Sequence, residues 1–305
     1  MRIAVIGAGV MGCIYGGPLS VNNEMLLVDV YKPHIDAINN DGLRIKELDG
    51  SINVYGNPRA TDDTSKESPA DIVILLCKGY QTASALGSNK RLIGENTVVL
   101  SLQNGYGNAD EIMKFVPQEQ IVLGTSSHGG IMEGPGKVFH SGTGVTQLGC
   151  LTESQRSAEM IASVLESAGI KEVVLVPNVK RLVWHKLFVN CAINPIGALP
   201  NDTNQTVLNN EFSNAAARKI VAEAVEVANA AGMDFDFNEE FEYVLTVSKE
   251  TANVRCSMLA DVTNKRKTEV DRINGAIVSE AAKLGMRAPL NELMTELIHA
   301  KELTY

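Results

Sequence analysis

Residues 1–12 read MRIAVIGAGVMG, and this stretch decides the fold of the first half of the chain. A short apolar run at 2–6 is typical of a buried strand, and a G-x-G-x-x-G pattern follows it directly. The first glycine permits a tight turn, the second lets backbone approach a pyrophosphate, and the third lets a helix pack on the strand. The bare pattern is weakly specific, but its place between a strand and a helix predicts a dinucleotide site rather than a purely structural turn. The expected contacts are Gly7, Ala8, Gly9, Val10, Met11 and Gly12.

The first half of the chain continues to alternate strand-like and helix-like segments. Apolar runs at 25–28, 72–77, 97–100 and 121–123 are separated by helix-length segments such as 31–40. The run at 72–77, IVILLC, is wholly apolar, as expected for a strand that is covered on both faces. This alternation predicts βαβ units and a mostly parallel sheet.

The pattern changes in the middle of the chain. Residues 137–149, KVFHSGTGVTQLG, predict a hairpin with Gly-rich turns that adds to the sheet in the antiparallel sense. After about Pro177 strand patterns vanish, and 180–193, 211–231 and 254–284 have the composition and spacing of helices. We therefore expect an α/β domain followed by an all-α domain. The two predicted domains are 1–177 and 178–305.

The composition limits the partners and the compartment. The chain has 305 residues with 27 basic and 36 acidic side chains, so its formal charge of −9 disfavours nucleic acid and anionic membranes as partners. No apolar run is long enough to span a membrane, and the N-terminus lacks a signal-peptide pattern, so we expect a soluble cytoplasmic protein. The scattered cysteines are expected to be buried thiols, and the histidines lack metal-ligand spacing, so no metal is expected. These residues are Cys13, Cys77, Cys150, Cys191, Cys256, His128, His140 and His185.

The end of the second predicted strand bears on the choice of cofactor. Asp29 follows Gly12 by 29 − 12 = 17 residues, where an acid usually accepts a ribose 2′-hydroxyl and favours NAD over NADP. Lys32 could instead bind a 2′-phosphate, or it could be an ordinary surface lysine. These residues alone leave both cofactors open.

One lysine lies inside an apolar helical segment, LVWHKLFVNCAINPIGALP. Lys186, Asn190 and Asn194 follow one another at four-residue spacing, which places them on one face of a helix. A buried ammonium with a lowered pKa beside neutral amides suits a proton donor in a pocket. The alternative is a lysine that reaches solvent beside two structural asparagines. Pro195 is expected to interrupt the helix and to free backbone carbonyls.

Two further polar residues lie in the last predicted helices. Taken alone, Glu269 is expected to be a surface acid that pairs with Lys265 at i−4. Ser257 precedes Glu269 by 12 residues, a separation that rotates two side chains by about 120° on an ideal helix. Both therefore reach one pocket only if the helix bends or the ligand spans it.

Several motifs, in this order along the chain, resemble the ketopantoate reductase family, whose members reduce 2-dehydropantoate to pantoate with NADPH. They are GAGVMG, CKGYQT, LQNGYGN, VFHSGTGVTQLG, WHKLFVNCAINPIGAL and SMLADVTNKRKTEVDRINGAIV. The likeness covers nearly the whole chain, and the last two motifs are the most specific. It implies a Rossmann domain followed by an all-α domain of the 6-phosphogluconate dehydrogenase C-terminal-like type, with the active site in the cleft between them. It also implies a place in pantothenate and coenzyme A biosynthesis.

The resemblance implies roles for individual residues. Lys186 corresponds to the general acid that protonates the keto oxygen as hydride arrives. Asn104 corresponds to the residue near the nicotinamide, and Glu269 to the residue that holds substrate or cofactor hydroxyls. Lys78 corresponds to a cofactor contact on the 2′-phosphate side. The implied substrate contacts are Asn104, Asn190, Asn194, Asn204, Ser257 and Glu269.

The chain also departs from the family pattern, and other functions stay open. Many members carry an arginine just after the second strand, where Val30 and Tyr31 stand here, with Lys32 nearby. The resemblance therefore implies NADP(H), whereas Asp29 leaves NAD(H) open. The alternatives are an NAD(P)-dependent dehydrogenase of another 2-keto or hydroxy acid, and a non-catalytic NAD(P) sensor. The apolar helices are compatible with a homodimer without determining one.

Overall fold

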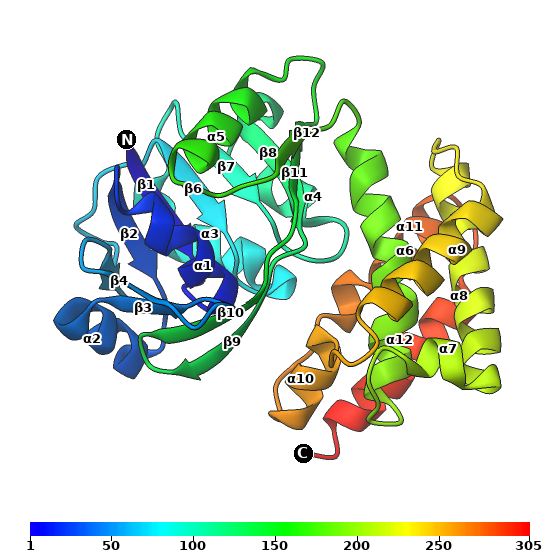
Figure 1. Cartoon of the computed structure of the whole chain (residues 1–305). Helices are drawn as coiled ribbons and strands as arrows, with labels where there is room; N and C mark the ends of the chain where they lie inside the picture. The colour runs from blue at the N-terminus through cyan, green and yellow to red at the C-terminus, as the bar shows by residue number, and fades with distance from the viewer. The chain divides into compact units, whose positions relative to one another are not determined.

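A computed structural model describes all 305 residues, and the chain divides into two compact units (Figure 1). Unit 1 comprises Met1–Gln103 and Asn108–Leu182, and unit 2 comprises Asn104–Gly107 and Val183–Tyr305. Unit 1 is built on a mostly parallel sheet and unit 2 on helices, which confirms the predicted fold class. The predicted first domain ends at residue 177. Unit 1 extends to Leu182, and the four residues Asn104–Gly107 belong to unit 2.

The larger sheet of unit 1 has eight strands. They are β1 (Arg2–Ile6), β2 (Glu24–Val28), β5 (Arg59–Thr61), β6 (Ile72–Leu75), β7 (Val98–Ser101), β8 (Ile121–Ser126), β11 (Thr146–Cys150) and β12 (Val173–Leu175). Their spatial order is β12-β11-β8-β7-β6-β1-β2-β5, and only the pair of β11 with β8 is antiparallel. The strand order reverses at β1, which pairs with β2 on one side and β6 on the other. Ligands of open α/β sheets bind at such a reversal, beyond the carboxyl ends of the strands.

Helices cover this sheet because its central strands are apolar on both faces. All four residues of β6 are buried, as are the last four of β1. The helices of unit 1 are α1 (Val10–Leu19), α2 (Lys32–Asp41), α3 (Thr82–Ser88), α4 (Asn108–Ile112) and α5 (Arg156–Ser167), with 3-10 turns η1 (Gly79–Gln81), η2 (Lys90–Leu92) and η3 (Gln118–Gln120). Helix α5 contacts β8, β11 and β12, whereas α4 contacts β7 and β8.

A second, four-stranded sheet packs against α1. Its strands are β3 (Leu43–Lys46), β4 (Ile52–Tyr55), β9 (Gly129–Gly134) and β10 (Lys137–Gly142), in the order β4-β3-β10-β9. The predicted hairpin over 137–149 is wrong, because β10 pairs with β9 and β3 while β11 joins the larger sheet. The tight turn lies upstream, at Gly136 with a φ of 69°, so β10 already has its antiparallel partner when the chain reaches Gly144. The antiparallel addition of β11 to the larger sheet is confirmed.

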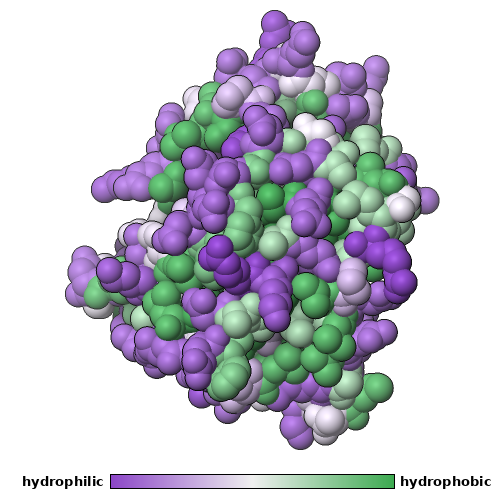
Figure 2. All heavy atoms as spheres, turned by 90° about the vertical axis from the view of Figure 1, so that its right-hand side faces the viewer, coloured by the Kyte–Doolittle hydropathy of each residue, from purple (hydrophilic) through white to green (hydrophobic).

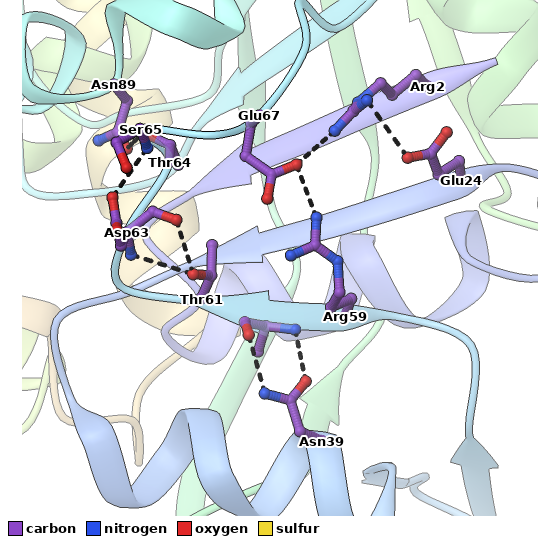
Figure 3. Close-up of polar contacts among 11 residues, drawn as sticks. Arg2, Glu24, Asn39, Arg59, Thr61, Asp63, Thr64, Ser65, Glu67 and Asn89 are labelled. Carbon is purple, nitrogen blue, oxygen red and sulfur yellow. Dashed lines mark hydrogen bonds and ion pairs between the residues drawn. The ribbon is translucent and has the colours of Figure 1, made fainter.

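Side chains hold edge strand β5 of the larger sheet to its neighbouring segments (Figure 3). Asn39 on α2 donates to the carbonyl of Ala60 at 2.9 Å and accepts from its N–H at 2.8 Å, which ties the helix to edge strand β5. The carboxylate of Glu67 bridges Arg2 and Arg59 at 2.5 and 2.7 Å. These contacts fix the strand next to Asp29, whose backbone N–H donates to the carbonyl of Thr61.

Unit 2 contains the remaining helices around one apolar core, except that the first turn of α6 belongs to unit 1. They are α6 (Val179–Ala198), α7 (Thr206–Asn209), α8 (Glu211–Ala230), α9 (Phe237–Glu250), α10 (Ser257–Thr263), α11 (Asn274–Lys283) and α12 (Pro289–Glu302), with a 3-10 turn η4 (Val270–Arg272). Trp184, Phe188 and Phe235 lie in the core. Side chains cap several of these helices; Asn210 accepts from the first N–H groups of α8, and Asp236 does so for α9. No helix of the structure is both long enough and apolar enough to cross a bilayer.

Pro195 does not interrupt helix α6, contrary to the sequence expectation. The helix runs on to Ala198, and Pro195 lies inside it. A proline removes the hydrogen bond to the carbonyl four residues earlier, which here belongs to Cys191. That carbonyl accepts instead from the side-chain amide of Asn274 at 3.0 Å. The freed carbonyl was correctly expected, and a partner from α11 lets the helix continue.

The helix predicted over 254–284 is also wrong, because the chain breaks into α10, η4 and α11. Helix α10 ends where Lys265 takes a φ of 55°. The N–H of Arg266 bonds to the carbonyl of Asp261 and that of Lys265 to Val262, the pattern of a Schellman cap. Glycine usually occupies the left-handed position of this cap. Because a lysine stands there, the sequence does not indicate that the helix ends.

Candidate active site

The glycine loop after β1 has the geometry that a pyrophosphate requires. Gly7 has a φ of 97°, and a Cβ there would clash with the backbone of Cys77. A Cβ on Gly12 would clash with the carbonyl oxygen of Gly7, so α1 packs this closely only with glycine. Gly9 faces open space, and as the N-cap of α1 it leaves the first N–H groups of the helix without a side-chain cap. These residues fit a dinucleotide pyrophosphate at the positive end of the helix.

The end of β2 presents an acid and a lysine that already has acidic neighbours. Asp29 accepts a hydrogen bond from the N–H of Tyr31 at 3.0 Å. The side chain of Lys32 is 60% exposed, and its ammonium lies 3.8 Å from Asp36 and 3.7 Å from Asp62. Ion pairs this exposed are weak, so a 2′-phosphate could displace them.

Two further loops follow the carboxyl ends of neighbouring parallel strands. Lys78 follows β6 and is partly buried, at the start of the η1 turn. Gln103 follows β7, and its side chain donates to the carbonyl of Cys77 at 2.9 Å. Because β1, β6 and β7 are parallel, Gly7, Lys78 and Gln103 lie along the same edge of the sheet.

The loop Asn104–Gly107 belongs to unit 2, although it follows a strand of unit 1. The N–H of Tyr106 donates to the carbonyl of Arg272 at 2.9 Å, and its ring lies 4.7 Å from that of Trp184. Gly105 has a φ of 85°, and a Cβ there would clash with the same Arg272 carbonyl. Asn104, predicted to lie near the nicotinamide, is thus in the same unit as Lys186. The sequence does not indicate this docking, since it depends on a residue far along the chain.

Helix α6 carries the predicted acid and both predicted amides. Trp184, Leu187 and Phe188 of this helix are buried in the core, which fixes the orientation of Lys186 between them. Burial lowers the pKa of Lys186 from its usual 10.5 to about 8, and the negative charge of Glu269 acts in the opposite direction. The amine is therefore mostly protonated at pH 7 and half protonated near pH 8, so it is able to donate a proton in this pH range.

The amides on α6 differ in their surroundings. Asn190 is partly exposed. Asn194 is 4% exposed, and its Nδ2 has no hydrogen-bond partner in the protein. A buried amide without a partner is costly, so this donor is suited to a ligand acceptor.

Glu269 is not the surface acid that its sequence pattern favours. It is 6% exposed, in the turn between α10 and η4. Lys265, its expected partner, is exposed and forms the cap of α10. The negative charge of the Glu269 carboxylate instead raises the pKa of Lys186. The break between α10 and η4 also removes the single-helix relationship assumed for Ser257 and Glu269.

The remaining predicted substrate residues also lie in unit 2. Asn204 is 7% exposed, donates to the hydroxyl of Thr251 at 2.8 Å, and has an Oδ1 without a partner in the protein. Ser257 is exposed as the first residue of α10.

The histidines and cysteines take structural positions. His128 bonds to His140 at 3.0 Å, and His140 bonds to Glu47 at 2.9 Å. His185 bonds to the buried carboxylate of Glu240 at 2.6 Å. No cluster of three or more His, Cys, Asp or Glu side chains is arranged to hold a metal ion. Every cysteine is a free thiol, and all are buried except the partly exposed Cys77.

Comparison with known proteins extends these observations over the whole chain. Models of the family described as "Ketopantoate reductase PanE/ApbA" and of its C-terminal part match residues 3–153 and 178–302. A 2-dehydropantoate 2-reductase of Pyrococcus abyssi is 36% identical over 99% of this chain and 98% of its own. A D-mandelate dehydrogenase solved with NADH and anilino(oxo)acetate has a TM-score of 0.93 at 31% identity, covering 100% of this chain and 99% of its own. A ketopantoate reductase of Ralstonia eutropha has a TM-score of 0.90 at 29% identity, covering 100% and 99%.

A dinucleotide loop on a Rossmann-type sheet, joined to a helical unit with a lysine of lowered pKa, defines an NAD(P)-dependent oxidoreductase. Within that class, the chain belongs to the ketopantoate reductase family.

Proposed function

We propose that this protein reduces 2-dehydropantoate to (R)-pantoate with NADPH, as a step in pantothenate and coenzyme A biosynthesis. The observation that carries the proposal is the ammonium of the partly exposed Lys186, whose pKa desolvation lowers to about 8 while the charge of Glu269 acts on it. Full-length relatives named 2-dehydropantoate 2-reductase support the choice of substrate.

The proposed roles follow from charge and position. The nicotinamide supplies a hydride to the C2 carbonyl carbon of the substrate. Negative charge then develops on the carbonyl oxygen, where the Lys186 ammonium stabilises it and delivers a proton, which leaves a secondary alcohol and a neutral amine. Glu269 keeps the amine protonated at neutral pH by opposing the effect of burial.

The substrate contacts are proposed for amide and hydroxyl groups of unit 2. The unpartnered Nδ2 of Asn194 is suited to an anionic or carbonyl oxygen, and the unpartnered Oδ1 of Asn204 to a hydroxyl. The exposed Ser257 is proposed to bind the substrate carboxylate. The full proposed set is Asn104, Asn190, Asn194, Asn204, Ser257 and Glu269, with Asn104 and Glu269 also touching the cofactor.

The cofactor contacts are proposed along the carboxyl edge of the sheet in unit 1. The loop from Gly7 to Gly12 would hold the pyrophosphate, and Lys32 and Lys78 the 2′-phosphate of NADPH. Asp29 opposes this preference, because a carboxylate repels a phosphate and accepts a ribose hydroxyl.

The test is an activity panel on the purified full-length chain, with 2-dehydropantoate and other 2-keto acids and with each reduced cofactor. Loss of absorbance at 340 nm with 2-dehydropantoate as the preferred substrate is the expected result. Tight cofactor binding without turnover of any keto acid would indicate a non-catalytic NAD(P) sensor instead of an enzyme.

A second function has a specific observation in its favour. The D-mandelate dehydrogenase complex with anilino(oxo)acetate has the same fold over the full length, so an aromatic 2-keto acid is the main competitor in the panel. A higher kcat/KM for phenylglyoxylate than for 2-dehydropantoate would assign the protein to that activity.

We also propose a cytoplasmic location and a homodimer, with the small keto acid rather than nucleic acid as the partner. Figure 2 shows hydrophobic patches between hydrophilic residues on one face of the molecule. Unit 2 exposes several large apolar side chains that dimerisation would cover, and light scattering tests the assembly. Among them are Phe212, Leu293, Leu297 and Leu303.

A further inference from the structure

His299 on the last helix, α12, lies between two carboxylates. Its Nδ1 is 2.8 Å from Oε2 of Glu302, and its Nε2 is 2.7 Å from Oδ1 of Asp271. An ionised carboxylate only accepts hydrogen bonds, so both ring nitrogens must donate. The geometry therefore requires an imidazolium held between two anions.

The second oxygen of Glu302 reaches the chain next to Glu269. Its Oε1 accepts from the backbone N–H of Thr268 at 2.7 Å, and Thr268 is completely buried. The hydroxyl of Thr268 in turn accepts from the N–H of Val270 at 3.3 Å. Glu302 thus holds the residue before Glu269, while Asp271 lies two residues after it.

Other charged and polar groups around this cluster connect the turn that bears Glu269, the C-terminal segment and the end of α6. Lys267 lies 3.4 Å from the second oxygen of Asp271. The hydroxyl of Tyr305 donates to the carbonyl of Arg266 at 2.8 Å. Lys301 donates to the carbonyl of Leu199, just past the end of α6, at 3.2 Å. The C-terminal helix therefore holds the turn that bears Glu269 and the chain that leaves the lysine helix.

We propose that Glu302 and His299 are positioning residues, which hold the Glu269 carboxylate where its charge supports the ammonium of Lys186. This inference rests on the proposed roles of Lys186 and Glu269. Neither Glu302 nor His299 is proposed to touch the reacting atoms. Their effect passes through the backbone of the turn at Thr268.

We call His299, Glu302 and Asp271 the clamp. Its hydrogen bonds depend on pH because its groups titrate. Burial lowers the pKa of His299, but the hydrogen bonds to Glu302 and Asp271 outweigh it and raise the pKa above 6.5. Burial raises the pKa of Glu302, but the bonds from Thr268 and His299 outweigh it and lower the pKa below 4.5. The contribution of His299 to the stability of the folded protein is complete below about pH 6.5 and is lost as the pH rises through its raised pKa. The contribution of Glu302 is lost as the pH falls through its lowered pKa.

The experiment compares E302A and H299Q with E296A, which removes an exposed carboxylate from the same helix. Release of the turn moves the Glu269 charge from Lys186, so the alkaline limb of the kcat/KM profile should shift to lower pH by roughly one unit in E302A. The displacement of the Glu269 carboxylate should also lower kcat roughly 10- to 100-fold. H299Q should give a smaller shift in the same direction, and E296A none.

A lower Tm in E302A with the kcat and alkaline limb of E296A would overturn the inference and leave a merely structural contact. If E302A does not fold, E302Q decides, because its amide oxygen still accepts from Thr268 while the charge that holds His299 is gone. E302Q is then expected to match H299Q, and a profile equal to that of E296A would count against the clamp. Absence of 2-dehydropantoate turnover in the unaltered protein refutes the proposed function itself, and an unaltered turnover in K186A refutes the role of Lys186, so each failure is distinguishable from that of Glu302 and His299.

Discussion

Asn274 donates its side-chain amide to the carbonyl of Cys191 at 3.0 Å, across two helices and 83 residues of sequence. That carbonyl is the one that Pro195 leaves without its helical donor. The bond lets α6 continue to Ala198, which keeps Asn194 on the same helix as Lys186. A structural amide on one helix thus maintains the geometry of the candidate active site on another.

N274A should destabilise the protein by about 1–3 kcal/mol, because it leaves a buried carbonyl without a donor. Asn274 is fully buried and also donates to Asn291, so water cannot readily replace it. Urea unfolding with a linear fit measures the loss. N238A, which removes an exposed amide from α9, is the control. Equal midpoints in the two variants would show that the Cys191 carbonyl does not depend on this bond.

K186A should lower kcat by roughly 10²–10⁴-fold with a smaller effect on cofactor binding, because it removes the proton donor. Steady-state kinetics with 2-dehydropantoate and cofactor titration by fluorescence separate the two effects. K180A removes an exposed lysine from the first turn of the same helix and should keep full activity. Turnover in K186A within a factor of two of K180A would exclude Lys186 as the acid.

The pH profile should report the Lys186 amine. With a pKa of about 8 the ammonium is present below that pH and is lost above it, so kcat/KM should be level on the acid side and fall above about pH 8. The Glu269 charge raises the pKa of Lys186, so E269Q should move the alkaline limb to lower pH. E292Q, which neutralises an exposed acid on α12, should leave the limb in place. A limb that stays in place in E269Q would mean that another group sets it.

The ratio of kcat/KM for NADPH to that for NADH tests how the residues that follow β2 set the cofactor preference. K32A should lower this ratio about tenfold, since a charged hydrogen bond to phosphate is worth roughly 1.5–3 kcal/mol. D29A should raise the ratio, because it removes an anion that competes with the phosphate. K90A, at an exposed lysine of the same unit, provides the baseline. No change in K32A would assign the selectivity to Lys78 or to the backbone.

Local sequence patterns were enough for much of the α/β unit. The predicted strand at 2–6 coincides with β1, and the predicted runs at 25–28 and 121–123 lie within β2 and β8. These segments are buried on both faces, so each is recognisable from its own apolar composition. The four-stranded sheet was not foreseen, because the strands β3 and β4 have exposed and charged positions and give a weak pattern.

The glycine loop and the residues on α6 were determined by the sequence itself. A strand, a turn that only glycine can make and a helix follow one another directly, and Lys186, Asn190 and Asn194 share a helix face by spacing alone. Tertiary structure alone decided that Glu269 is buried, that Asn104–Gly107 joins unit 2, and that Asn274 sustains α6 past a proline. Each of these depends on a partner many residues away, because burial and hydrogen bonding are properties of the packed chain, whereas a local pattern reports only on neighbours within a turn or a strand.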